Sequence, residues 1–153
     1  MDERERFTRL WVEESATTRR VFERIPEGST YRPDTRSRTA QEIAWQIVGE
    51  ERLIIESLET GRMAWTPVPM PASMADVLAA YDALSADMGD RWRALPDERW
   101  SGTPDFGGRE RPAAGMAWSF LLDIVHHRGQ ISTYLRPMGS TVPQIYGPSA
   151  DEP

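Results

Sequence analysis

The sequence predicts an all-α fold, a four-helix bundle with long connectors and an extended C-terminal tail. Four segments repeat apolar residues at steps of three and four, which is the period of a helix with one buried face. Proline lies near the ends of these segments and not inside them, and no pair of alternating strand patterns is present. With 153 residues, the chain is expected to form a single domain over residues 1–153.

The first two helices are expected over residues 3–25 and 39–59. Pro26 ends the first apolar pattern, because a proline lacks the backbone N–H that would continue the helix. The second segment opens with Thr39 and Glu42, the spacing of a capping box, in which each side chain satisfies a backbone donor of the first turn. A proline-rich connector, TPVPMPAS, follows this helix.

The third and fourth helices are expected over residues 73–95 and 112–136. Ser73, with Asp76 three residues later, begins the third pattern, and Pro112 suits the first turn of the fourth. The connectors are longer than a minimal up-down bundle needs. Either crossovers or functional loops would explain their length.

The composition argues against several classes of function. A net charge of −6 argues against a nucleic-acid partner, because a phosphate backbone requires a basic surface. The chain has no cysteine, which excludes disulfides, thiolate metal sites and cysteine nucleophiles. The charged start, MDERERF, and the lack of a long apolar run argue against a signal peptide or a membrane span, so a cytoplasmic protein is expected.

The fourth helix carries both histidines of the chain, and they are not equivalent. At about 100° per residue, His127 falls near the middle of the buried stripe and Asp123 lies one turn earlier, at its edge. His126 projects off the stripe. The inward Asp123–His127 pair is either a hydrogen-bonded core pair or part of a metal site. The stripe itself is formed by Met116, Phe120, Ile124, Ile131 and Tyr134.

The second helix has a similar anomaly. Glu50 falls among the isoleucines of the buried face, and Gln46 lies one turn before it. A buried carboxylate is costly unless a cation or hydrogen bonds compensate. Pairing with a buried arginine such as Arg128 is one explanation, and a metal held jointly with the fourth helix is another.

Two stretches resemble the DinB (damage-inducible, YfiT-like) family. HHRGQISTYLRPMG and the following VPQIYGPSADE are similar to the C-terminal helix and tail of that family, and RTAQEIAWQIVGEE is similar to its second helix. The resemblance implies a four-helix bundle, often a homodimer. It also implies a divalent metal, such as nickel or zinc, between the second and fourth helices.

The family's usual three histidine ligands fall on Gln46, Asp123 and His127, so only one histidine is kept. Aspartate is a good ligand for zinc or a harder ion, whereas a neutral glutamine is a weak one. Glu50, one turn on, is the expected substitute for Gln46. Such a mixed oxygen and nitrogen site favours manganese, zinc or iron over nickel.

Two functional hypotheses follow from the resemblance. The first is a divalent-metal-dependent enzyme acting on a small molecule, either a thiol-dependent transferase or isomerase, or a hydrolase. The second is a non-catalytic bundle with a degenerate metal site that acts as a stress-related binding module. Acid–base catalysis by Asp123 and His127 without metal is a weaker third reading.

Four further residues are candidates for contact with a substrate or with the ligands. His126 and Arg128 are expected to steer an anionic substrate, and Gln130 lies near enough to the inner face to touch one. Tyr146, in the tail, is expected to close the pocket.

Overall fold

A computed structural model describes all residues from 1 to 153, and the all-α class is confirmed because the chain forms helices and no strands. None of these helices combines the length and the apolar character needed to cross a membrane. The helices are α1 (Glu3–Phe22), α2 (Ala40–Thr60), α3 (Met74–Ser85), α4 (Met88–Ala94), α5 (Asp97–Trp100) and α6 (Ala113–Leu135).

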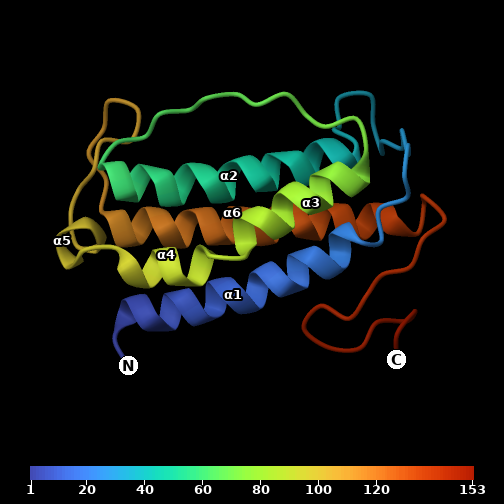
Figure 1. The fold of residues 1–153 in the computed structure, drawn as a ribbon. Helices are drawn as coiled ribbons and strands as arrows, with labels where there is room; N and C mark the ends of the chain where they lie inside the picture. The colour runs from blue at the N-terminus through green and yellow to red at the C-terminus, as the bar shows by residue number, and fades with distance from the viewer.

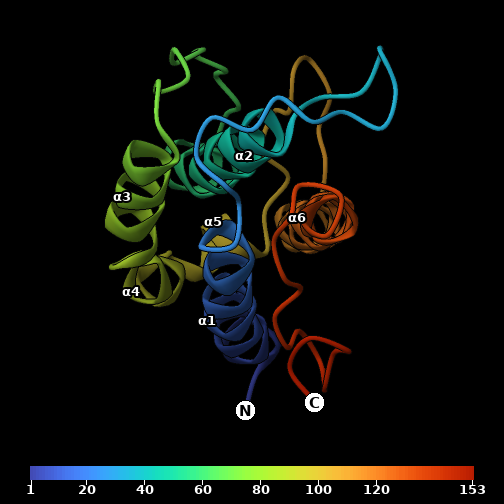
Figure 2. The ribbon, with the colours of Figure 1, turned by 90° about the vertical axis from the view of Figure 1, so that its right-hand side faces the viewer.

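The long helices lie side by side around one core (Figures 1 and 2). Viewed end on, α2, α6, α1 and the α3–α4 pair form the four corners (Figure 2). Helices α2 and α3 run in the same direction, opposite to α1 and α6 (Figure 1). The closest packing joins α2 to α6, so the polar residues on their facing sides are brought together.

The predicted count of four helices is wrong, because the stretch between α2 and α6 forms three helices instead of one. The third helix, expected to be continuous over residues 73–95, breaks into α3 and α4 between Ser85 and Met88. Ser85 and Asp87 flank the break, and Gly89 follows it. Short polar side chains compete for backbone hydrogen bonds, and glycine is a poor helix former, so the local propensity is low here. The short α5 forms in a loop that was expected to be irregular.

The predicted helix ends depend on local contacts, and most are confirmed. Thr39 and Glu42 make both hydrogen bonds of the capping box, and the Ser73 side chain accepts from the backbone N–H of Asp76. Gly61 ends α2 with a φ of 82°, a left-handed conformation that glycine adopts without strain. Pro112 lies one residue before α6 rather than inside its first turn.

The connector between α2 and α3 is a crossover, here called the strap and defined as residues 62–72. It returns along the outer side of α2, so that α3 starts near the end at which α2 started (Figure 1). Two α2 side chains hold it. The indole Nε1 of Trp45 donates to the carbonyl of Val68 at 3.0 Å, and the Gln41 amide donates to the carbonyl of Pro71 at 2.9 Å.

Candidate metal centre

Helices α2 and α6 bring three candidate ligands together. Glu50 comes from α2, and Asp123 and His127 come from successive turns of α6. One ligand atom from each lies within 4.8 Å of the other two. The His127 Nε2 atom is 3.6 Å from Glu50 Oε1 and 3.8 Å from Asp123 Oδ1. The expected convergence of Glu50, Asp123 and His127 is therefore present; these three residues are called the triad below.

The imidazole of His127 has the tautomer that a metal ligand needs. Its Nδ1 lies 2.8 Å from Oε1 of Gln130, three residues along α6. An amide oxygen only accepts hydrogen bonds, so Nδ1 carries the proton. Nε2 then carries the lone pair, and it is the atom that faces Glu50 and Asp123. Gln130, predicted to touch a substrate or the ligands, supports His127 in this way.

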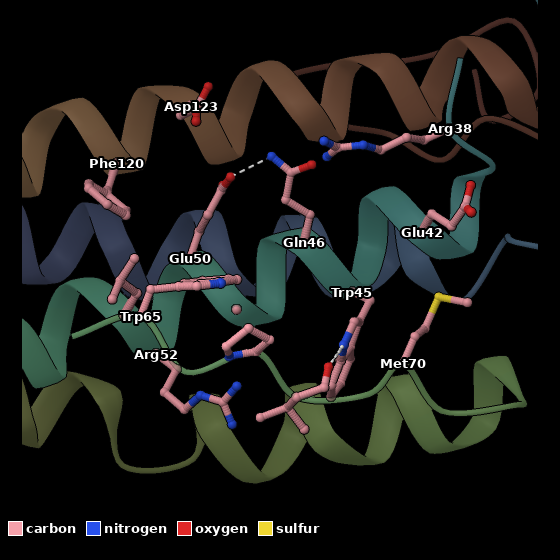
Figure 3. A pocket seen from close by; sticks show the side chains of 14 residues that line it. Arg38, Glu42, Trp45, Gln46, Glu50, Arg52, Trp65, Met70, Phe120 and Asp123 are labelled. Atoms are coloured by element: carbon pink, nitrogen blue, oxygen red, sulfur yellow. Dashed lines mark hydrogen bonds between the residues drawn. The ribbon is translucent and has the colours of Figure 1, made fainter. Parts of the chain in front are cut away.

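Gln46 lies between the two helices and contacts the triad directly. Its Nε2 donates to Glu50 Oε1 at 2.6 Å and lies 2.7 Å from Nε2 of His127. Its Oε1 is buried without a hydrogen-bond partner, as is Oε2 of Glu50. Buried acceptors are rarely left unpaired. Oε2 of Glu50, which belongs to the triad, is therefore an acceptor that a bound cation would satisfy, whereas the Gln46 oxygen is turned toward Arg38 (Figure 3).

The three side chains of the triad differ in their exposure to solvent. The side chains of Glu50 and His127 are 12% and 15% exposed, whereas that of Asp123 is 55% exposed. Burial raises the pKa of Glu50, and the nearby Gln46 amide and His127 oppose that rise. Two ligands are thus held inside the protein while the third borders solvent. An ion held here would be approached from the Asp123 side.

A pocket of about 680 Å³ opens beside the triad, lined in part by Glu50, Gln46 and Asp123 (Figure 3). The strap forms its outer wall. Arg38 lies at the end nearest Gln46, and its guanidinium points toward that side chain (Figure 3). This volume is in the range of pockets that bind small molecules.

Two predicted site residues are not brought to the triad. Arg128 is 1% exposed and faces α1, where its Nη1 lies 2.6 Å from Oε2 of Glu14. The idea that it pairs with Glu50 is wrong, because Glu14 neutralises it. Tyr146 donates its hydroxyl to the same Glu14 carboxylate at 2.9 Å. Arg128 and Tyr146 therefore attach the tail to α1 and do not line the pocket.

His126 is exposed on the outer side of α6, as its position off the stripe predicts. It makes no side-chain hydrogen bond. Its ring centroid lies 5.3 Å from that of His127. It borders a shallow hollow together with Asp123.

Sequence reasoning missed two polar or aromatic features near the site. Glu51, next to Glu50, is 1% exposed and accepts a hydrogen bond from the Tyr81 hydroxyl at 2.9 Å. Glu51 lies four residues after Ile47 and four before Ile55, and this spacing could have placed it on the same buried face of the helix. Trp65 was also missed, although an aromatic residue in a proline-rich connector is unusual enough to note. It lies on the strap and lines the pocket.

Comparison with known proteins decides the family. The sequence profile of the DinB family matches residues 1–153. The chain belongs to the DinB family. A relative in sequence, the uncharacterised protein YrdA of Bacillus subtilis strain 168, is 25% identical over 152 residues, covering 95% of this chain and 89% of its own length.

Solved DinB-like proteins share the fold. One from Bacillus subtilis, YjoA, superposes with a TM-score of 0.75 at 17% identity, covering 93% of this chain and 98% of that protein. Another, from Bacillus cereus ATCC 10987, gives a TM-score of 0.74 at 22% identity, covering 92% and 95% of the two chains. Both likenesses establish the DinB fold for this chain.

Proposed function

We propose that this DinB protein is a divalent-metal-dependent enzyme acting on a small molecule. The observation that carries the proposal is the triad of Glu50, Asp123 and His127, whose ligand atoms lie within 4.8 Å of one another at the edge of a pocket of about 680 Å³. A metal centre and a place for a substrate are therefore adjacent. The residues present fit a divalent ion, because two carboxylates balance its charge and an imidazole lone pair is aimed at the same point.

The donor set selects among ions. Two carboxylates and one imidazole favour manganese, zinc or iron over nickel, which prefers a richer set of nitrogen ligands here. Gln46 would be a weaker fourth ligand only after its amide turned over, because its Nε2 and not its Oε1 faces Glu50 and His127. When bound, the ion would act as a Lewis acid and lower the pKa of a water or thiol at an open position.

The residues of the chain orient and protect this centre. Gln130 holds His127 in the tautomer that leaves Nε2 free. The Glu50 side chain is only 12% exposed, which keeps its local electrostatic interactions strong. These features suit hydrolysis or thiol transfer to a small molecule, the two reaction classes that the family resemblance implies.

A specific observation favours the second hypothesis, a non-catalytic binding module with a degenerate site. The Nε2 group of Gln46 reaches both Glu50 and His127. Its two N–H donors stand where a cation would otherwise compensate those acceptors. With glutamine in place of a histidine, part of the hydrogen-bonding capacity of the polar cluster is met without metal. Asp123 and His127 would then have only a structural role.

The deciding experiment is a metal analysis of untagged protein, purified without chelator, by mass spectrometry. The His127→Ala variant tests the triad, and His126→Ala is the matched control because its side chain is exposed and makes no hydrogen bond. We expect near-stoichiometric metal in the wild type and in the control, and loss of it in His127→Ala. Metal should also raise the melting temperature of the wild type by mass action.

The absence of metal from all three proteins, even after incubation with manganese, zinc and nickel, would refute the enzyme proposal and favour the binding module. We further propose a homodimer, on the family resemblance, and separately a cytoplasmic location. Light scattering tests the dimer, and cell fractionation tests the location.

A further inference from the structure

The strap concentrates apolar surface around the pocket. Three of its large apolar side chains remain open to solvent, Trp65 at 55%, Met70 at 43% and Val68 at 42%. All three line the pocket beside the triad. Isolated exposed apolar residues are ordinary, but several that surround one hollow indicate a surface kept open for binding.

The ring of Trp65 approaches α2 closely by one edge, where residue 49 is glycine. A Cβ atom at Gly49 would come 3.1 Å from Cη2 of the Trp65 ring, which is closer than comfortable van der Waals contact. The indole therefore rests directly on the helix backbone, close to Glu50 (Figure 3). Because the Trp65 side chain is 55% exposed and lines the pocket, much of its ring surface is open to a bound molecule.

Two further aromatic side chains line the same pocket. Trp45 stands on α2 with its indole N–H engaged by the strap, so its ring is fixed in place. Phe120 approaches from α6 (Figure 3). The pocket lining thus combines aromatic and apolar side chains with charged ones, among them Glu50 and Asp123 of the triad.

We propose that this pocket binds a small molecule with a flat apolar group, such as an aromatic ring, and that Trp65 is the residue that selects for it. Aromatic rings stack on an indole in offset or tilted contact and gain more than the buried area alone provides. The flat group lies against Trp65, and the polar end of the molecule faces the triad. The orientation of the polar end rests on the proposed function, but binding of the flat group does not.

The test uses metal-free full-length protein with chelator present and 2-naphthylmethanol as the probe. Isothermal titration calorimetry measures its dissociation constant for the wild type and for Trp65→Ala, Trp65→Phe and Leu122→Ala. Leu122 is a matched control, since it is 66% exposed on α6 and does not line this pocket. Circular dichroism confirms that each variant is folded, which is expected because Trp65 lies on an exposed connector.

We expect Trp65→Ala to raise the dissociation constant of the probe by about tenfold or more. Trp65→Phe should keep most of the wild-type affinity, and Leu122→Ala should leave the affinity unchanged. A second pair of smaller probes tests the preference for a flat group. Cyclohexylmethanol, which is apolar but not flat, should bind more weakly than benzyl alcohol, which has a flat ring of similar size. Binding that does not respond to Trp65→Ala, or no binding at all, overturns the proposal. So does binding that weakens as protein concentration rises, because a second copy would then be the natural occupant of the pocket.

The outcomes separate this inference from the proposed function. Probe binding that depends on Trp65, in a protein that takes up no metal, would support the ligand class proposed for the pocket and refute the proposal of a metal-dependent enzyme. Stoichiometric metal bound through His127, with no binding of the probe, would support the metal centre and overturn the ligand class proposed here.

Discussion

The Nδ1 atom of His127 lies 2.8 Å from Oε1 of Gln130, one turn along the same helix. This contact sets which nitrogen of the imidazole faces Glu50 and Asp123. A single helix thus carries two candidate ligands, Asp123 and His127, and the group that orients one of them, at spacings of four and three residues.

The first prediction concerns this contact. Gln130→Leu removes the acceptor for Nδ1 at similar side-chain volume, so His127 loses its fixed tautomer and ring orientation. The affinity for zinc or manganese, measured by calorimetry, is expected to fall by roughly 10- to 100-fold. His126→Ala, in the same helix, should change it by less than about twofold, in line with the small effects of surface substitutions. Equal effects of both substitutions would show that Gln130 has no orienting role.

The second prediction restores a ligand. Gln46→His places an imidazole at the position that family resemblance assigns to the missing histidine, next to Nε2 of His127. We expect tighter binding of zinc and nickel, by about tenfold or more, because a neutral amide oxygen is a poor ligand and imidazole a good one. Competition with a coloured chelator measures the change. Gln46→Ala is the control, and it should not increase affinity for either ion.

The third prediction is a pH dependence of stability centred on Glu51. Burial raises the pKa of this carboxyl from its ordinary value of 4.5 to about 8, so the folded protein keeps it protonated at neutral pH. The unfolded chain ionises above pH 4.5. The contribution of Glu51 to stability is therefore complete at low pH and declines between about pH 4.5 and 8.

Glu51→Gln keeps an acceptor for the Tyr81 hydroxyl and cannot ionise. Its unfolding free energy relative to the wild type is expected to rise by about 3 kcal/mol between pH 5 and pH 7.5, at roughly 1.4 kcal/mol per pH unit. Urea denaturation at several pH values checks this slope. Glu56→Gln, on an exposed position of α2, is the control, and parallel curves for Glu51→Gln and the wild type would contradict the prediction.

The fourth prediction concerns the buried ion pair of Arg128 and Glu14. Arg128→Met leaves the Glu14 carboxylate buried without its cation, which typically costs about 3 to 5 kcal/mol of stability. Chemical denaturation measures the loss. Arg93→Met breaks the exposed pair with Glu5 and should cost no more than about 1 kcal/mol. Comparable losses in the two variants would mean that the burial of Arg128 contributes little.

Local sequence signals predicted most of the fold. Capping residues and apolar periodicity act over a few residues, so Thr39, Ser73 and the long stripe of α6 could be interpreted without knowing the neighbours. The break near Ser85 was missed because the apolar stripe continues in register across it: Tyr81, Met88 and Trp92 are all buried.

The partners of buried charges could not be predicted in the same way. Periodicity gives the direction of a side chain about its own helix, but not which helix it meets. Helix α6 packs on both α2 and α1, so His127 faces one neighbour and Arg128, the next residue, faces the other. Helix α2 is similar. Glu50 faces α6 and Glu51 faces Tyr81 of α3, although a single buried stripe was assumed for the whole helix.

The strap has a consequence for how the protein can change over evolution or in engineering. Its apolar wall is attached to α2 through Trp45 and Gln41, which donate to backbone carbonyls of the strap. Backbone acceptors do not depend on the identity of the residues that carry them. The strap sequence can therefore be exchanged to change the shape of the pocket while the triad on α2 and α6 stays in place, so that the pocket wall and the candidate metal centre are inherited on separate parts of the chain.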